Sequence, residues 1–272
     1  MITDEPDNYW NANMTNSKKT TDSPANRELL GSRTFKFACH DGVSCFTRCC
    51  HNADMYLYPY DIVRMKQNLN MTSEEFLVAH TTTAIRDMPT FPNVMLKMSD
   101  HQGSPCTFLT EKGCTVYPDR PYSCRAYPLE PAVYGESDGT LRMQYYVMHH
   151  DYCKGHDESK EWTAKSWMVD QEMQPYTEPN NAWARIAGRL QNDSFRAQGL
   201  DMNSPPMKMA FMAAYNIDTF RRFVFESSFL SRYIVPDQQL DAVKQDDREL
   251  LMLGLSWIER FLFSDGALEE RV

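Results

Sequence analysis

The sequence predicts a mostly α-helical protein with a loop-rich, metal-organised N-terminal half, minor α+β character and a helical C-terminal third. Three observations predict this fold class. All eight cysteines of the 272 residues lie between Cys39 and Cys153. The same segment holds many prolines and turn-forming pairs such as Asp41-Gly42, which favour loops over regular elements. After Cys153, apolar residues recur every three or four positions, which is the spacing of amphipathic helices.

Composition divides the chain into three parts. Residues 1–33 are rich in Asn, Thr, Ser and Asp, and we expect a flexible N-terminal lead because so few apolar side chains can be buried there. Residues 34–158 form the predicted cysteine-cluster, metal-binding domain. Residues 159–272 form the predicted helical C-terminal region.

Local signals place several elements within these parts. Pro59 suits the first turn of a helix, and Asp61 is favourable at its N-terminal end. Thr72 and Glu75 form a capping box, which predicts a second helix directly after Thr72. Periodicity predicts short strands at 93–98 and 141–148, and helices at 162–173, 181–190, 207–229 and 237–263.

Charge and hydropathy exclude some classes of partner. With 37 acidic and 28 basic residues the net charge is −9, so the chain lacks the basic footprint of a nucleic-acid-binding protein. No stretch approaches 18 consecutive apolar residues, and the N-terminus does not resemble a secretion signal. We therefore expect a cytoplasmic protein without nucleic-acid or membrane partners, whose thiols stay reduced and available to metals.

The cysteines carry the strongest chemical signal. Buried structural cysteine, disulfides and a redox dithiol are the competing explanations, but no Cys-x-x-Cys pair is present and the first cluster lies among polar residues. Metal ligation explains the clustering best. The expected metal ligands are Cys39, Cys45, Cys49, Cys50, Cys106, Cys114, Cys124 and Cys153.

The identity of the metal is less constrained by spacing. Zinc sites use matched Cys-x2-4-Cys pairs, which this chain matches only in part, and the bacterial ferredoxin spacing is absent. A cubane cluster nevertheless accepts ligands from distant loops, so an iron–sulfur cluster, [4Fe–4S], is the expected cofactor and Zn²⁺ the alternative. His40, His51 or His156 could replace one thiolate, although polar loop histidines are more often without such a role.

Two segments resemble a known family. Cys45-Phe46-Thr47-Arg48-Cys49-Cys50 and the segment CTFLTEKGCTVYPDRPYSCRAYPLEP, which begins at Cys106, look like the YkgJ-type cysteine-cluster proteins, also called the CxxCxxCC zinc- or iron-chelating family. The resemblance implies metal or iron–sulfur binding, and the same module resembles part of the flagellin lysine N-methylases. The family has a tighter first cluster, so Cys39 corresponds least well to its pattern.

The expected function is a metal-binding protein that holds an iron–sulfur cluster in a redox or structural role. One alternative is a cluster-containing enzyme such as a lysine N-methyltransferase, although no glycine-rich loop for a nucleotide cofactor is present and no catalytic residue stands out. The other is a zinc-stabilised interaction module that binds a protein partner through the helical C-terminal region. Arg120, between two prolines, is expected to brace the loop that carries Cys114 and Cys124.

Overall fold

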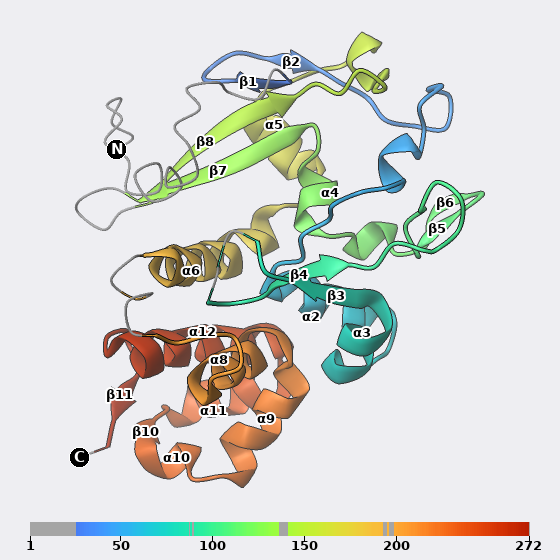
Figure 1. Cartoon of the computed structure of the whole chain (residues 1–272). Helices are drawn as coiled ribbons and strands as arrows, with labels where there is room; N and C mark the ends of the chain where they lie inside the picture. Colours follow the sequence, from blue (N-terminus) through green and yellow to red (C-terminus); the bar gives the residue numbers. More distant parts are fainter. Residues whose placement is uncertain are drawn as a thin grey trace. The chain divides into compact units, whose positions relative to one another are not determined.

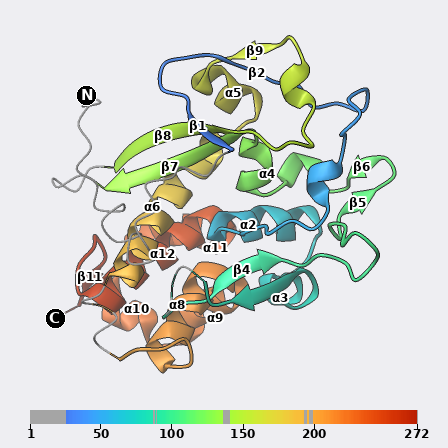
Figure 2. The ribbon, with the colours of Figure 1, turned by 45° about the horizontal axis from the view of Figure 1, so that its top comes forward.

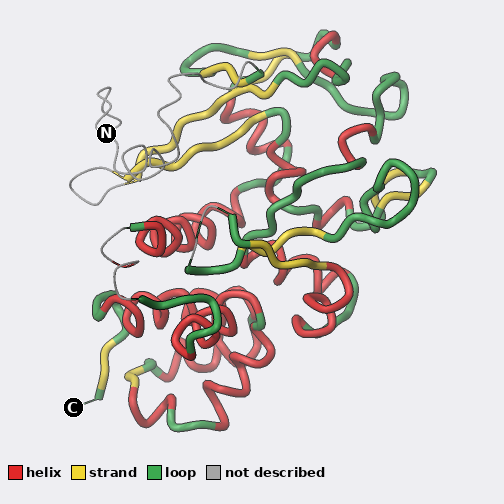
Figure 3. The backbone as a smooth tube through the Cα atoms, viewed as in Figure 1, coloured by secondary structure: helices red, strands yellow, loops and turns green. Residues whose placement is uncertain are grey.

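A computed structural model describes residues 26–86, 88, 90–135, 141–192, 195 and 199–271. They divide into two compact units, each assembled from segments that are far apart in the chain. The first, here called the cysteine unit, contains the described parts of residues 1–55, 98–115 and 122–175. The second, here called the helical unit, contains 56–97, 116–121 and the described residues from 176 onward. Figure 3 shows that loops and strands dominate the cysteine unit and helices the helical unit.

The cysteine unit contains one three-stranded antiparallel sheet. β7 (Leu129–Gly135) and β8 (Leu141–Met148) form its long hairpin, and β1 (Arg27–Leu29) pairs with the other edge of β8 (Figure 1). The strand predicted at 141–148 is therefore confirmed. Strand β1 lies within the segment that composition predicted to be flexible, and residues 1–25 of that segment lie outside the described residues.

An aromatic core packs beside this sheet. β2 (Phe35–Lys36) pairs with β9 (Glu161–Trp162), and α5 (Ala164–Asp170) follows directly (Figure 2). The indole N–H of Trp162 donates to the carbonyl of Phe37, and that of Trp167 to the carbonyl of Ala126, each at 2.8 Å. Both indoles are buried, so these bonds satisfy their polar atoms while the rings fill the core.

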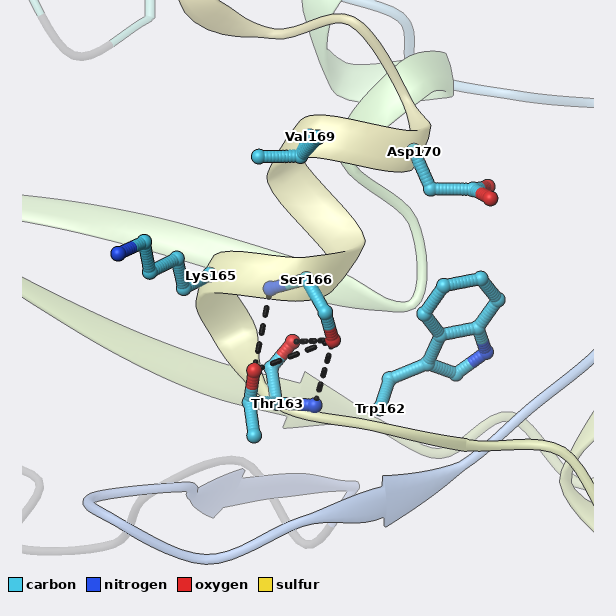
Figure 4. Close-up of a pocket in the computed structure, with 6 residues that line it drawn as sticks. All are labelled: Trp162, Thr163, Lys165, Ser166, Val169 and Asp170. Carbon is cyan, nitrogen blue, oxygen red and sulfur yellow. Dashed lines mark hydrogen bonds between the residues drawn. The ribbon is translucent and has the colours of Figure 1, made fainter.

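Helix α5 begins at a capping box. Thr163 Oγ1 accepts from the amide of Ser166, and Ser166 Oγ accepts from the amide of Thr163, both at 3.0 Å (Figure 4). The same turn lines an open hollow of about 440 Å³, which contains no cysteine. Helix α5 confirms the helical pattern predicted at 162–173, although the helix itself is shorter.

Short elements joined by loops carry the cysteines, as the loop-rich prediction requires. They are the 3-10 turn η1 (Arg48–Cys50), the hairpin of β5 (Leu109–Thr110) and β6 (Gly113–Cys114), and helix α4 (Tyr122–Ala126). The 3-10 turn η3 (Gly155–Asp157) begins two residues after Cys153.

The helical unit begins where the capping signals predicted. Helix α2 (Pro59–Asn68) starts at its proline, and α3 (Ser73–His80) starts after Thr72, which shares the predicted capping box with Glu75. The ribbon then forms β3 (Thr81–Ala84), paired with β4 (Asn93–Leu96) in the region of the predicted strand. The remaining elements are η2 (Tyr117–Asp119), α6 (Gln174–Gln191), α8 (Pro205–Tyr215), α9 (Ile217–Glu226), α10 (Phe229–Arg232), α11 (Asp237–Gln245), α12 (Asp247–Phe263), and the paired β10 (Tyr233–Ile234) and β11 (Glu269–Glu270).

Two predicted helices are each divided in the structure. The pattern at 207–229 breaks at Asn216, and the pattern at 237–263 breaks at Asp246. Asp246 caps α12 by accepting from the amide of Arg248 at 2.7 Å. Caps of this kind restart a helix without interrupting apolar periodicity, so the periodicity alone did not reveal them. No described helix is long and apolar enough to cross a membrane.

A buried ion-pair network joins the helices of the helical unit. The ammonium group of Lys66, on α2, lies 2.8 Å from Asp247 on α12 and 3.0 Å from Asp218 on α9. Lys66 is only 6% exposed. Burial tends to raise the pKa of the Asp247 carboxyl, but hydrogen bonds from Lys66, Gln67 and Arg221 hold it below its ordinary value. The ammonium group of Lys66 therefore links carboxylates on two other helices, and Arg221 provides a second cation for Asp247.

Replacing Lys66 with methionine should lower the free energy of unfolding by about 3 kcal/mol, because two partly buried carboxylates would lose the cation between them. Denaturant unfolding at neutral pH measures this change. Lys208→Met is the matched control: Lys208 is an exposed lysine of α8 and its replacement should change stability by no more than about 0.5 kcal/mol. Equal stabilities of the two variants would contradict a stabilising role for the network.

The same network predicts a pH dependence. Because the pKa of Asp247 is lower in the folded than in the unfolded state, its ionisation stabilises the fold at neutral pH. This contribution is lost as the pH falls below the ordinary aspartate range and through the folded-state value. The acid loss should be smaller in Lys66→Met than in the wild type, since Lys66 helps to depress the pKa.

Gly155 allows two segments of the cysteine unit to approach closely. A Cβ atom at this position would lie 2.6 Å from the ring of Phe37 and 2.7 Å from the carbonyl oxygen of Ala38. The amide of Ala38 donates to the Gly155 carbonyl at 3.0 Å. The absence of a side chain therefore fixes the loop after Cys153 against the strand that precedes Cys39.

Gly155→Ala should lower the free energy of unfolding by about 2 kcal/mol, because the added methyl group overlaps backbone as well as a buried ring. Thermal unfolding measures the effect. Gly42→Ala serves as control, since a Cβ there meets only the exposed His40 ring, at 3.0 Å. An unchanged melting temperature in Gly155→Ala would mean that the close approach is not required.

Candidate metal centre

All eight predicted ligands belong to the cysteine unit, although they come from three separate segments of the chain. None of them forms a disulfide. Three are exposed and five are partly buried, so the thiols lie at or just below the surface. The exposed thiols are those of Cys39, Cys49 and Cys124.

Five thiols form an inner group. Cys49 and Cys50 lie on η1, and the amide of Cys106 donates to the carbonyl of Cys50 at 2.7 Å. Cys114 ends β6 and Cys124 lies on α4. Side chains from all three segments are close enough to change one another's charge state. The fold therefore brings together the positions that the family pattern emphasised.

The electrostatics of the inner group oppose full deprotonation. The Cys50 thiol donates to the sulfur of Cys49 and lowers the pKa of Cys49 to about 7, against the effect of burial. Donating that hydrogen bond raises the pKa of Cys50 far above its ordinary value, and burial and the thiolates of Cys124 and Cys106 add to the effect. Burial, together with neighbouring thiolates, also raises the pKa of Cys106. Several thiolates can coexist here only if a cation compensates their charge.

Cys45 and Cys153 form a second pair beside this group. The backbone amide of Lys154 donates to the Cys45 sulfur at 3.0 Å. Burial raises the pKa of Cys153, and the neighbouring Cys45 contributes in the same direction. Tyr152 lies near thiols of both groups. Burial raises its pKa, and the thiolates of Cys49, Cys153, Cys45 and Cys50 add to this effect. Seven thiols thus lie in one continuous region.

Cys39 occupies a different position. It is exposed and follows Ala38, whose amide is bonded to Gly155, two residues after Cys153. Its backbone therefore runs close to Cys153 of the second pair. This placement agrees with the weaker match of Cys39 to the family pattern.

The three histidines near the cysteines contact backbone atoms. His51 Nδ1 lies 3.3 Å from the Thr47 carbonyl, and His156 Nε2 lies 3.0 Å from the Met148 carbonyl. His40 Nδ1 accepts from the amide of Gly42 at 3.1 Å. These contacts favour the ordinary loop role over replacement of a thiolate.

Some neighbours of the thiols had no distinct signal in the sequence. The ring of Phe46 lies 3.7 Å from the position of a Cβ on Gly113, which places the first cysteine segment against the β5–β6 hairpin. The thioether of Met55 lies 3.6 Å from the sulfur of Cys124. Tyr127 lies beside Cys153.

Arg120 acts within the helical unit as the sequence predicted for a bracing residue. Its guanidinium group is buried, donates to the Tyr117 carbonyl at 2.7 Å and lies 3.9 Å from the centre of the Tyr117 ring. The side chain therefore closes the turn between the two prolines.

The donor set fits a metal centre in its chemistry. Seven sulfur donors lie together, and soft thiolates suit zinc or an iron–sulfur cluster. Among the described residues, no three side chains of His, Cys, Asp or Glu are already arranged around a point that could hold one metal ion.

Comparison with known proteins agrees with this chemistry. Residues 38–158 match the family model CxxCxxCC, described as "Putative zinc- or iron-chelating domain". No curated protein and no solved structure was matched by the chain. The matched segment contains all eight cysteines and supports metal binding through them. Residues 38–158 are therefore similar to the zinc- or iron-chelating domains that the CxxCxxCC model describes.

Proposed function

We propose that the cysteine unit binds an iron–sulfur cluster through its thiolates. The observation that carries this proposal is the gathering of seven thiols from three chain segments into one region without a disulfide. The inner five are the principal candidate ligands, and Cys45, Cys153 and, less closely, Cys39 lie beside them. Metal binding explains why the fold concentrates groups that repel one another when ionised.

The arrangement supports a cluster of several irons over a single zinc ion. A structural zinc ion takes four ligands around one point, whereas no three described donors converge on one point. The ligand positions of a cluster are spread over several metal atoms, so sulfurs that do not converge can still be used. Backbone amides also donate to these sulfurs, as from Lys154 to Cys45, and such bonds stabilise negative charge on a cluster.

The role that we propose is redox or structural. Cys49 and Cys124 are exposed, so a cluster held by them would lie near solvent, within reach of an electron donor or acceptor. It would also join segments that otherwise share few regular elements. Binding of a protein partner through the helical C-terminal region and lysine methylation stay predictions that no feature of this site supports further.

Protein purified without oxygen should be brown and should contain iron and acid-labile sulfide in similar molar amounts. Elemental analysis and visible absorption measure this. The sulfur chemistry predicts this result because soft thiolates retain reduced iron clusters. A colourless protein with stoichiometric zinc would contradict the iron–sulfur assignment.

Cys49→Ser and Cys124→Ser should each lose most of the bound metal, since a hydroxyl is a poor replacement for a soft thiolate. Cys39→Ser is the comparison variant: Cys39 corresponds least well to the family pattern, so this variant should retain most of the metal. Metal content per folded protein is the measurement, with circular dichroism as a check on folding. Full metal content in Cys49→Ser would remove that residue from the ligand set.

A further inference from the structure

The hydroxyl of Tyr127 is buried beside the proposed metal centre. Within the part of the chain that the structure describes, no group satisfies this hydroxyl with a hydrogen bond of ordinary geometry. Its neighbours include two sulfurs: the Cys153 side chain lies within reach of the hydroxyl, and Cys49 is near enough to act on it electrostatically. A buried hydroxyl without a partner costs free energy, so its retention at this place calls for an acceptor.

Stacked rings fix the direction of this side chain. The Tyr127 ring is stacked on His150, with ring centres 5.8 Å apart and planes at 11°. His150 is in turn stacked on Tyr152, at 5.1 Å and 5°. On another side Phe37 meets Tyr127 edge to face at 5.7 Å. The column of Tyr127, His150 and Tyr152 thus holds the hydroxyl in place next to Cys153.

We infer that Tyr127 is a positioning residue of the metal centre, whose hydroxyl donates a hydrogen bond to the sulfur of Cys153 once that sulfur is a metal-bound thiolate. The inference rests on the proposed function, because the acceptor is a ligated sulfur. A thiolate accepts hydrogen bonds more strongly than a thiol does, so loading the centre would supply the partner that the hydroxyl lacks. Donation to a ligand sulfur withdraws charge from the cluster and favours its reduced form.

Tyr127→Phe tests the inference, since it removes the hydroxyl and keeps the ring contacts with Phe37 and His150. Tyr145→Phe is the matched control: the Tyr145 hydroxyl contacts the thioethers of Met143 at 2.8 Å and Met168 at 2.9 Å. The measurement is the midpoint potential of the anaerobically purified holoprotein. The potential should become more negative in Tyr127→Phe by about 59 mV, which corresponds to a tenfold change in the equilibrium constant of one-electron reduction. It should not change in Tyr145→Phe.

An unchanged potential in Tyr127→Phe, or an equal change in both variants, would overturn the inference. Iron analysis of the wild type tests the proposed function separately. If the wild type holds zinc instead, the iron–sulfur proposal fails but the inference can still be decided. Competition with a chelator, using zinc alone, should then show a dissociation constant about tenfold higher in Tyr127→Phe than in Tyr145→Phe. Equal zinc affinity would overturn it.

Discussion

Thiolates repel one another, and several of them can share a small volume only when positive charge lies among them. The cysteine unit is built around this constraint. The pKa of Cys50 is raised by its hydrogen bond to Cys49 and that of Cys106 by burial, and neighbouring thiolates add to both effects. Protons can relieve the repulsion, but a metal relieves it while binding the segments together. The turns and the hairpin that carry the thiols are short and contain little regular secondary structure. A metal that the sulfurs bind in common would therefore stabilise their arrangement.

A metal-independent scaffold supports one side of this arrangement. The indole of Trp167 is bonded to Ala126, at the end of the helix that carries Cys124, and the indole of Trp162 is bonded to Phe37, two residues before Cys39. Aromatic packing and the β7–β8 hairpin therefore fix where these cysteine segments begin or end. Only the loops between these fixed points then have to bring the remaining thiols into position. The helical unit is held in another way, by apolar helix packing and the buried ammonium of Lys66.

The elements that sequence reasoning found were those with local causes. Pro59 and the Thr72 capping box begin helices through contacts within one turn, and the strand at 141–148 follows from alternation within a few residues. All eight cysteines belong to one unit, as their restriction to one segment of the sequence suggests, and their role as ligands stays a prediction. The stacking of His150 on Tyr127 was not foreseen, since it joins residues 23 positions apart and neither residue type is distinctive.

The assignment of chain segments to the two units also could not be predicted from local sequence patterns. Composition changes at about residue 158, yet residues 56–97 belong with the later helices, and only non-local contacts could reveal this. Lys66, for example, finds its partners at Asp218 and Asp247, more than 150 residues further along the chain.

This interleaving has a consequence for synthesis. The last segment of the cysteine unit ends at Pro175, so the ribosome releases every thiol and the whole aromatic core well before α8 to α12 are made. Helices α2 and α3 are therefore made before the helices they pack against, and their apolar faces stay uncovered until then. The segments of the cysteine unit on either side of α2 and α3 can already fold together. A nascent chain could thus acquire its metal early and still depend on chaperones until its last helices emerge.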